Sequence, residues 1–367
     1  MRDKRRRDPL WGELGRTAAL GVVLAAVLLA LPLLLGVGPA RTGTAGKDAP
    51  SASPAAPAEN TALRDAGERV RLLQADGSVE TLTMADYLFG VVAAEMPASF
   101  ELEALKAQAC AARTYAARLR SDGKHDGADL CGDSSCCQAY LSPDAARTRW
   151  GRSARTYEEK LTAAVAETDG LGVLSGGKPI QAVFFSSAPG QTVDAAAVWG
   201  GGVDYLKSVS SPEGDEVPNY HTQVEQSADQ VRQAAQGAYP AVKLSGDPAG
   251  WFGPPSTDGG GTVLSQCLGG VTLTGSQLRQ LFSLRSAAFT VAWDGRQFVF
   301  SVTGYGHGVG MSQYGANAMA KEGKTFRDIL TWYYSGTEVG VIPIAPPIPP
   351  YTPPKSKAAS TTTALPR

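Results

Sequence analysis

Hydrophobic and polar residues alternate along three segments, and each segment has a turn signal near its centre. In RVRLLQADGSVETLTM the alternating runs flank Asp76 and Gly77, and in AAFTVAWDGRQFVFSVTGYG they flank Asp294 and Gly295. An Asp-Gly pair between apolar runs is typical of a tight β-hairpin. The stretch GLGVLSGGKPIQAVFFSSAPG has a Gly-Gly pair between two further apolar runs. The pattern therefore predicts strand pairs at these three places.

Apolar residues at helical spacing predict two consecutive helices after the first hairpin. Thr83, with an acid one turn later, resembles a capping box and predicts a helix from Met84 to about Glu95, which Pro97 ends. Ser99 is placed to cap a second helix over FELEALKAQACAARTYAARLRS. The residues expected to form the buried stripe of that helix are Leu102, Leu105, Ala109, Ala112 and Ala116.

Two more helices are expected near the end of the patterned region. One begins at about Ser312, and the other covers FRDILTWYYSG and stops at Gly336. Helices and antiparallel strands are thus interspersed along residues 65–341. We expect an α+β fold, in a single mixed domain with antiparallel strands and several helices.

The N-terminus predicts a membrane anchor. A basic cluster within residues 1–16 precedes residues 17–38, which carry no charge and are long enough to cross a bilayer as a helix. A cleaved signal peptide is the alternative, although its apolar core is usually only about 7–15 residues long. The positive-inside rule places the basic end in the cytoplasm and the rest of the chain outside. Residues 39–64 are expected to be a disordered linker, and the Pro- and Thr-rich residues 342–367 a disordered tail.

Composition excludes one broad class of function. The 367 residues carry a formal net charge of -1, so no overall positive charge supports binding to nucleic acid. The candidate chemistry lies instead in three short segments within the patterned region.

The first segment is GVVAAEMPASF, in which Glu95 is a lone acid among small apolar residues. It falls in the last turn of a predicted helix, where the helix dipole disfavours its ionised form, as apolar surroundings also do. Both effects raise the pKa of a carboxyl group, as a general acid for glycosidic cleavage requires. A structural carboxylate that accepts an N–H at a helix end is the alternative, and it is the commoner case.

The second segment is HDGADLCGDSSCC. His125, Cys131 and Cys137 offer one imidazole and two thiolates from a single loop, which suits zinc, with a water or a distant group as the fourth ligand. A disulfide from Cys131 to Cys136 or Cys137 is the alternative, because an extracytoplasmic setting permits one. By composition the two interpretations are evenly matched.

The third segment is GYGHGVGMSQYGANAMA, residues 304–320. Closely spaced glycines let backbone N–H groups approach a ligand, and a helix N-terminus follows them. It is not a nucleotide-binding loop, because it lacks GxxxxGK[ST]. His307 and Gln313 are its polar candidates for ligand binding, and a tight turn with a hydrogen-bonded histidine is the alternative.

These segments, together with FFSSAPGQT, DYLKSVSSPEGD and LTGSQLRQLFSLRSAAFTV, occur in an order that resembles the SpoIID/LytB family of sporulation proteins. The resemblance covers about residues 70–340, and the blocks AAEMP and GHGVGMSQYGA carry most of its specificity. It implies a membrane-anchored lytic transglycosylase, which cuts peptidoglycan strands between MurNAc and GlcNAc and leaves 1,6-anhydro-MurNAc ends. The preferred substrate would be strands already stripped of stem peptides.

The resemblance also implies a cellular setting and partners. The setting is the septal space between mother cell and forespore, during engulfment in sporulation. The implied partners are a peptide-removing amidase, stage II sporulation protein P, and a membrane protein, stage II sporulation protein M.

Residue roles follow by the same resemblance. Glu95 is implied to be the single acid and base, and zinc to be structural, held by His125, Cys131 and Cys137, with Cys136 spare or an alternative ligand. The expected substrate-binding residues include three at matching family positions, namely Arg113, Tyr205 and Lys207. Alternation along a strand would place the last two on one face. Further polar candidates are Ser186, Ser187, Gln191, His307 and Gln313, although turn positions would explain several of them equally well.

Three functions remain in competition. The first is the transglycosylase that uses Glu95. The second is a non-catalytic glycan-binding enhancer of a peptidoglycan amidase. The third is a zinc hydrolase, against which stands the thiolate-rich ligand set with no adjoining general base.

Overall fold

The computed structural model describes residues 64–120 and 124–343. These residues form a mixed α+β structure with antiparallel sheets and several helices, as the sequence predicts. The predicted membrane span 17–38, most of the linker and nearly all of the tail lie outside the described residues. Within the described ranges, no helix is both long enough and apolar enough to cross a bilayer.

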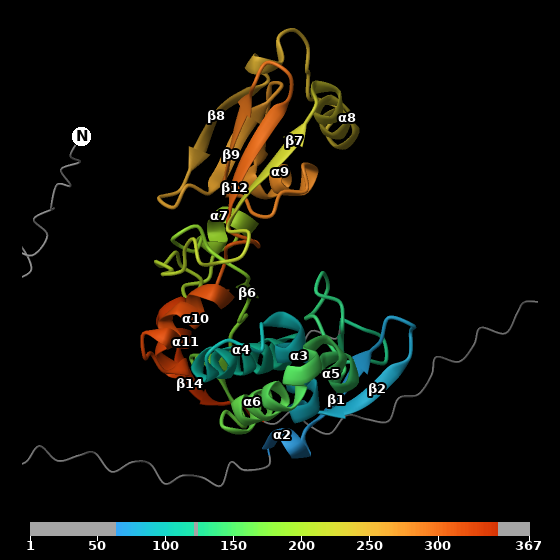
Figure 1. Cartoon of the computed structure of the whole chain (residues 1–367), viewed down its shortest axis with the longest axis vertical. Coiled ribbons are helices and arrows are strands. Elements are labelled where there is room, and N and C mark those ends of the chain that lie inside the picture. Colours follow the sequence, from blue (N-terminus) through green and yellow to red (C-terminus); the bar gives the residue numbers. More distant parts are fainter. Residues whose placement is uncertain (1–63, 121–123, 344–367) are drawn as a thin grey trace, which may run out of the picture. The chain divides into compact units, whose positions relative to one another are not determined.

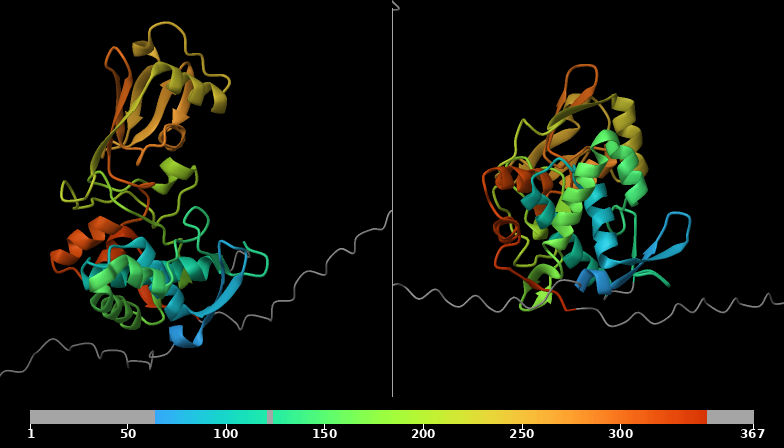
Figure 2. Two further views of the ribbon diagram at one scale, coloured as in Figure 1. Left: turned by 45° about the vertical axis from the view of Figure 1, so that its right-hand side comes forward. Right: turned by 60° about the horizontal axis from the view of Figure 1, so that its bottom comes forward.

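Helices pack around one long central helix, α4 (Leu102–Arg120), to form the first of two hydrophobic cores. Figure 1 shows α3 and α6 beside it, and Figure 2 shows α10 and α11 close to it, as the tertiary contacts confirm, while α5 packs against α3 and α6. The bounds of these helices are α3 (Met84–Glu95), α5 (Pro143–Trp150), α6 (Ala154–Ala166), α10 (Gln313–Lys321) and α11 (Phe326–Tyr333). The alanines of α4 let its neighbours approach closely, and nearly its whole middle section is buried.

Short sheets complete this core. In the first sheet β1 (Arg69–Leu73) pairs antiparallel with β2 (Val79–Thr83) and parallel with β3 (Leu130–Cys131). In the second, β4 (Leu171–Ser175) pairs with β5 (Lys178–Pro179) and β14 (Glu338–Val341). A parallel pair, β6 (Phe184–Phe185) with β13 (Met311–Ser312), joins two distant segments. Two predicted hairpins are thereby confirmed, one around Gly77 and one around Gly176 and Gly177.

A second hydrophobic core is built on residues 221–303, around Phe282, Phe298 and Phe300. The predicted Asp-Gly hairpin is present as β11 (Phe289–Trp293) and β12 (Phe298–Thr303), and β7 (His221–Gln226) extends it. A second three-stranded sheet contains β8 (Phe252–Thr257), β9 (Val263–Leu268) and β10 (Val271–Thr274). The helices α8 (Ala228–Ala238) and α9 (Gly275–Leu281) complete it. The remaining short helices are α2 (Arg64–Gly67), α7 (Ala195–Trp199), η1 (Gly151–Ser153) and η2 (Pro248–Gly250).

Most of the predicted helix ends are confirmed, but one predicted cap is wrong. The Thr83 side chain accepts the Asp86 N–H and begins α3 at Met84, and Met96 is already extended, so both predicted ends of that helix are confirmed. Ser312 caps α10 as expected. Ser99 does not cap α4, because the Phe100 N–H turns back to the Pro97 carbonyl and the helix begins only at Leu102.

Candidate active site

A cleft of about 640 Å³ brings together the three segments singled out in the sequence. It is lined by Glu95, by residues 136–139 of the cysteine loop, by residues 184–186, and by residues 305–307 with Gln313. The parallel pairing of β6 with β13 places the FFSS segment beside the glycine-rich block. Three residue groups that are far apart in the sequence therefore share one cavity.

Glu95 is the C-terminal residue of α3 and lines this cleft. Its Oε1 accepts the backbone N–H of Ala139 at 2.9 Å, and Nε2 of Gln313 lies 3.5 Å from its Oε2. Burial raises the pKa of Glu95, and the two hydrogen bonds oppose that rise only in part. Among the described residues that line the cleft, Glu95 is the only carboxylate.

Gln313, at the start of α10, connects this helix to α3 and α4. Its Nε2 also lies 3.5 Å from Oε1 of Gln108, a fully buried residue of α4. The amide thus bridges α3 and α4 from the first turn of α10, which fixes the distance between these helices at the cleft. Gln108 is a residue that the sequence gives no reason to select, because it lies within a long run of alanines.

The start of α10 is held by a buried acid, Glu213. Its Oε1 accepts from the Ala188 N–H at 2.7 Å and from the Ser312 hydroxyl, and its Oε2 accepts from the Ser211 hydroxyl at 2.5 Å. Ser312 in turn caps α10. The network ties the loop after β6 to the helix that carries Gln313. Ser186 lines the cleft, whereas Ser187 is buried in the loop behind it.

His307 lines the cleft as a neutral imidazole. Its Nδ1 accepts the Val309 N–H at 3.1 Å, so Nε2 carries the proton and donates to the Phe184 carbonyl at 3.1 Å. Burial and the nearby Arg279 charge lower the pKa of His307 to about 4. The preceding Gly306 has φ +123°, and a Cβ there would lie 2.6 Å from Cβ of Phe185. His307 is therefore a hydrogen-bonded, neutral imidazole in the wall of the cleft.

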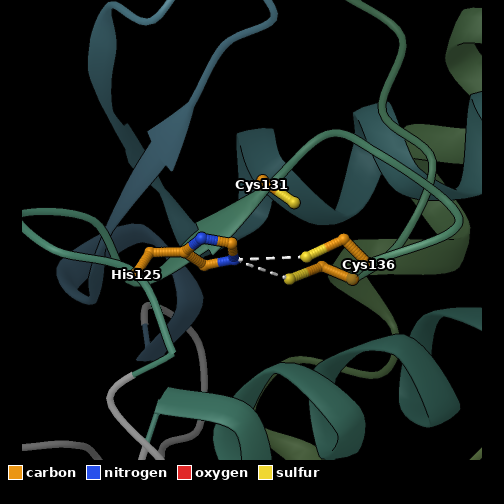
Figure 3. Close-up of side chains that lie close together, drawn as sticks. His125, Cys131 and Cys136 are labelled. Carbon is orange, nitrogen blue, oxygen red and sulfur yellow. Dashed lines mark hydrogen bonds between the residues drawn. The ribbon is translucent and has the colours of Figure 1, made fainter.

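The cysteine loop forms a four-ligand cluster beside the cleft. The ligand atoms of His125, Cys131, Cys136 and Cys137 all lie within 4.8 Å of one another (Figure 3). His125 Nε2 lies 3.2 Å from Cys137 Sγ and 3.7 Å from Cys136 Sγ. Donor atoms of a tetrahedral Cys₃His zinc site lie about 3.5–3.8 Å apart, so the donor set fits zinc. The three predicted ligands are brought together, and Cys136 joins them as a fourth.

The same loop contains free thiols, which contradicts the disulfide alternative, and it donates a hydrogen bond to Glu95. All five cysteines are free thiols in the described residues, including the three in the cluster. Cys131 is fixed by pairing with Leu73 of β1, and the loop then returns past Glu95. Ala139, whose N–H binds the Glu95 carboxylate, lies two residues after Cys137. The folded loop is thus a direct hydrogen-bonding neighbour of the candidate acid.

Arg113 is buried and does not line the cleft, which does not fit the expected sugar contact. Its guanidinium is only 2% exposed. Nε and Nη2 donate to the Asp65 carboxylate, and Nη1 donates to the Leu171 carbonyl at 2.7 Å. Each of the three guanidinium nitrogens has a protein acceptor and the side chain is almost fully buried, so Arg113 belongs to the core.

Tyr205 and Lys207 also lie outside the cleft lining. Their segment is a turn followed by irregular chain, so the predicted strand alternation is wrong. The Tyr205 hydroxyl accepts the N–H of Gln181, and the Lys207 ammonium pairs with Asp194 at 3.3 Å. Gln191 packs instead beside Gly259 and Gly260 and is not among the residues that line the cleft.

Three further lining residues were not predicted. Trp199 and Tyr305 are exposed aromatic residues, and Arg279 of α9 lies in the wall near His307. The flanking glycines of Tyr305 were the one available signal, because a large apolar residue between glycines has little to pack against. Trp199 and Arg279 come from segments that the sequence does not connect to the cleft.

Comparisons with known proteins show the family to which the chain is similar. Residues 74–174 match the family model SpoIID, described as stage II sporulation protein. The chain is 38% identical over 326 residues to stage II sporulation protein D of Bacillus subtilis (strain 168), covering 86% of this chain and 93% of that protein. It is 38% identical over 266 residues to stage II sporulation protein D of Bacillus amyloliquefaciens, covering 71% of this chain and 75% of that one. It is 30% identical over 303 residues to an amidase enhancer of Bacillus subtilis, covering 68% of this chain and 40% of that protein.

Proposed function

This chain belongs to the stage II sporulation protein D family, and from the chemistry of its cleft we propose that it is a peptidoglycan lytic transglycosylase. Its substrate would be peptide-stripped glycan strands, cut between MurNAc and GlcNAc to leave 1,6-anhydro-MurNAc ends. The observation that carries the proposal is the solitary carboxylate of Glu95 among the described residues lining the cleft.

A single carboxylate is informative because ordinary glycosidases need two. A hydrolase places a second acid across the sugar, as a nucleophile or as a base for water. An intramolecular reaction needs no such partner, because the attacking hydroxyl belongs to the substrate. The cleft therefore suits a lyase better than a hydrolase.

Glu95 would carry both proton transfers. In the first step the protonated carboxyl gives its proton to the glycosidic oxygen as the C1–O bond breaks. In the second, the resulting carboxylate takes the proton of the MurNAc C6 hydroxyl, whose oxygen forms the new bond to C1. No water is consumed, and Glu95 ends protonated as it began. The burial that raises the pKa of Glu95 favours the acid form needed at the start.

The hydrogen bonds around Glu95 suit this cycle. The Ala139 N–H stays on Oε1, which leaves Oε2, the oxygen nearer Gln313, to exchange the proton. Gln313 is itself fixed by Gln108 and by the capped start of α10. The carboxyl is therefore oriented by groups that neither take nor give a proton.

Zinc in this proposal is structural. His125, Cys131, Cys136 and Cys137 would hold it, and it would fix the loop that presents the Ala139 N–H. Four protein donors fill a tetrahedral site, whereas a catalytic zinc keeps a position open for water. The donor set thus argues against the zinc hydrolase.

The cellular setting belongs to the same proposal. Residues 17–38 would anchor the chain in the cell membrane, with residues 1–16 cytoplasmic and the catalytic part in the space between mother cell and forespore. The role would be forespore engulfment, with stage II sporulation proteins P and M as partners. The names of the relatives at 38% identity support a sporulation role.

A second candidate is a glycan-binding enhancer of an amidase. The similarity to a protein named amidase enhancer favours it, over 68% of this chain. In that case the cleft would bind glycan without cutting it, and Glu95 would be a binding residue.

The test compares the full chain with its Glu95→Gln variant on peptide-free glycan strands, with products identified by mass spectrometry. The exposed Glu225→Gln variant serves as the matched control. Anhydro-MurNAc ends from wild type and control, but not from Glu95→Gln, are the expected result. Reducing ends would instead show a hydrolase. Binding without cleavage would establish the enhancer.

A further inference from the structure

The guanidinium of Arg279, in the wall of the cleft, has no acidic partner among the described residues. Arg279 lines the same cavity as Glu95, from helix α9. Its Nε donates to the backbone carbonyl of Arg285 at 3.1 Å, and no ion pair joins it to a carboxylate in the described part of the chain. Burial lowers the pKa of Arg279, which means that its positive charge is partly withdrawn from water.

Three other poorly exposed arginines in the described part of the chain are paired with acids. The pairs are Arg71 with Asp129, Arg113 with Asp65, and Arg120 with Glu68. Withdrawing a cation from water is costly unless a counter-charge accompanies it. Arg285 also has no acidic partner among the described residues, but it stacks on Tyr305 and does not line the cleft. Arg279 does line the cleft, where a ligand can supply the missing anion.

The surroundings of Arg279 suit a sugar. Tyr305 is 44% exposed although the Arg285 guanidinium stacks on its ring at 4.0 Å, and Trp199 is 46% exposed. Both aromatic residues line the same cleft as Arg279 and Glu95. Large exposed aromatic side chains inside a cavity mark a binding surface, since a protein otherwise buries them.

The chemistry of peptidoglycan contains a matching anion. MurNAc carries a lactyl group, whose carboxyl is bonded as an amide to the stem peptide in the intact wall. Removal of the peptide frees a carboxylate on every second sugar. A guanidinium binds a carboxylate through two parallel charge-assisted hydrogen bonds, but an amide offers neither the charge nor the second oxygen.

We propose that Arg279 binds the free lactyl carboxylate of a MurNAc unit lying against Tyr305 and Trp199, and so selects strands whose stem peptides have been removed. This rests on the proposed function and deepens it, because it assigns substrate choice to one side chain. Arg279 is a specificity-determining residue on the wall that faces the acid, and it takes no part in proton transfer.

The test measures binding in the full chain with Glu95→Gln, so that no ligand is cut. Three ligands are compared: peptide-free glycan, the same glycan with its lactyl carboxyls converted to amides, and a chitin oligosaccharide, which has no lactyl group. The peptide-free glycan should bind roughly 10- to 100-fold more tightly than the amidated glycan. Adding Arg279→Gln should remove that difference and leave the affinity for the chitin oligosaccharide unchanged.

The exposed Arg296→Gln variant is the matched control, since it removes one positive charge outside the cleft. Equal binding of free and amidated strands by the protein with Arg279 intact overturns the inference, and this comparison needs no folded Arg279 variant. Equal loss for all three ligands on Arg279→Gln, or no loss, overturns it as well. The proposed lyase activity is judged separately, from the cleavage products of wild type, so either idea can fail alone.

Discussion

The guanidinium of Arg113 and the carboxylate of Asp65 form a buried ion pair in which neither side chain is more than 3% exposed. Arg113 Nε lies 3.0 Å and 3.1 Å from the two carboxylate oxygens. The pair ties α2, at the beginning of the described chain, to the middle of α4. Arg113 is therefore a residue of the core, although it lies in the same segment of sequence as the candidate acid.

Replacing Arg113 by Ala should lower the free energy of unfolding by about 3–5 kcal/mol, because it leaves the buried Asp65 charge without a partner. Urea denaturation measures this loss. Replacing both residues, as Asp65→Leu with Arg113→Met, should restore much of the stability, since no unpaired charge remains. If the Arg113→Ala protein has normal stability but no longer binds glycan, Arg113 contacts the sugar instead.

Local signals explain why part of the fold could be predicted. The Thr83 cap and the Asp-Gly turns act within a few residues, so α3 and the hairpins follow from the sequence. The second core could not be predicted in this way, because β7 has the sequence HTQVEQ with one large apolar residue and β8 contains two prolines. Such strands are defined by their partners: β7 pairs with β12, which lies far away in the sequence, and β8 pairs with the nearby β9 through an irregular register.

Some residues of the candidate site could likewise be predicted from the sequence, and others could not. Glu95 is recognisable as a lone acid among small apolar residues, and the cysteine loop as a compact group of thiols with one histidine. Tyr205 and Lys207 were assigned to the cleft from matching family positions, and the strand expected to place both on one face is not formed. Arg279 and Trp199 reach the cleft only through the tertiary fold, so no spacing in the sequence could indicate them.

Gly315 in α10 leaves room for the Glu213 network. A Cβ at this position would lie 2.0 Å from the Tyr333 hydroxyl, 2.3 Å from Ser211 Oγ and 2.5 Å from Glu213 Oε2. Gly315→Ala should therefore destabilise the chain by about 1–3 kcal/mol through overpacking. It should also lower turnover, because the displaced helix carries Gln313.

The helical Gly237, exposed in α8 with nothing within 4 Å of its Cβ position, provides the control. Gly237→Ala should be neutral or stabilise by up to about 1 kcal/mol, since alanine is the better helix former. Thermal unfolding of both variants measures the contrast. Equal effects at the two positions would show that the Glu213 network is not tightly packed.

If Cys136 is a ligand, the metal site has four protein ligands and no open position for water. With four protein ligands, wild type should bind one zinc ion per chain. Removing a residue that only hydrogen-bonds to a metal ligand lowers metal affinity by roughly 10–100-fold. Cys136→Ser removes a ligand itself, so it should weaken zinc binding by more than that. Competition with a chromophoric chelator measures both affinities, and Cys267→Ser, outside the cluster, should match wild type. Unchanged affinity in Cys136→Ser would indicate three ligands and a water, whereas absence of stoichiometric zinc would contradict the metal itself.

The raised pKa of Glu95 makes a prediction about stability that is separate from activity. The folded chain holds the Glu95 proton more tightly than the unfolded chain does, for which 4.5 is the ordinary value. Its stabilising contribution is therefore complete below pH 4.5 and is lost as the pH rises through the raised folded value. Glu95→Gln has no proton to lose, so its stability relative to wild type should increase with pH. The gain should be about 1.4 kcal/mol for each unit by which the pKa is raised.

Denaturant unfolding of both proteins between pH 4 and pH 8, roughly the range over which such carboxyl groups titrate, measures this difference. Titration of the cysteine loop cancels in the comparison, because both proteins contain it. The exposed Glu225→Gln variant should show no comparable trend, since water already solvates that carboxylate. A constant difference between Glu95→Gln and wild type across the range would mean that the site does not favour the protonated acid. The first proton transfer of the proposed mechanism would then lack its source.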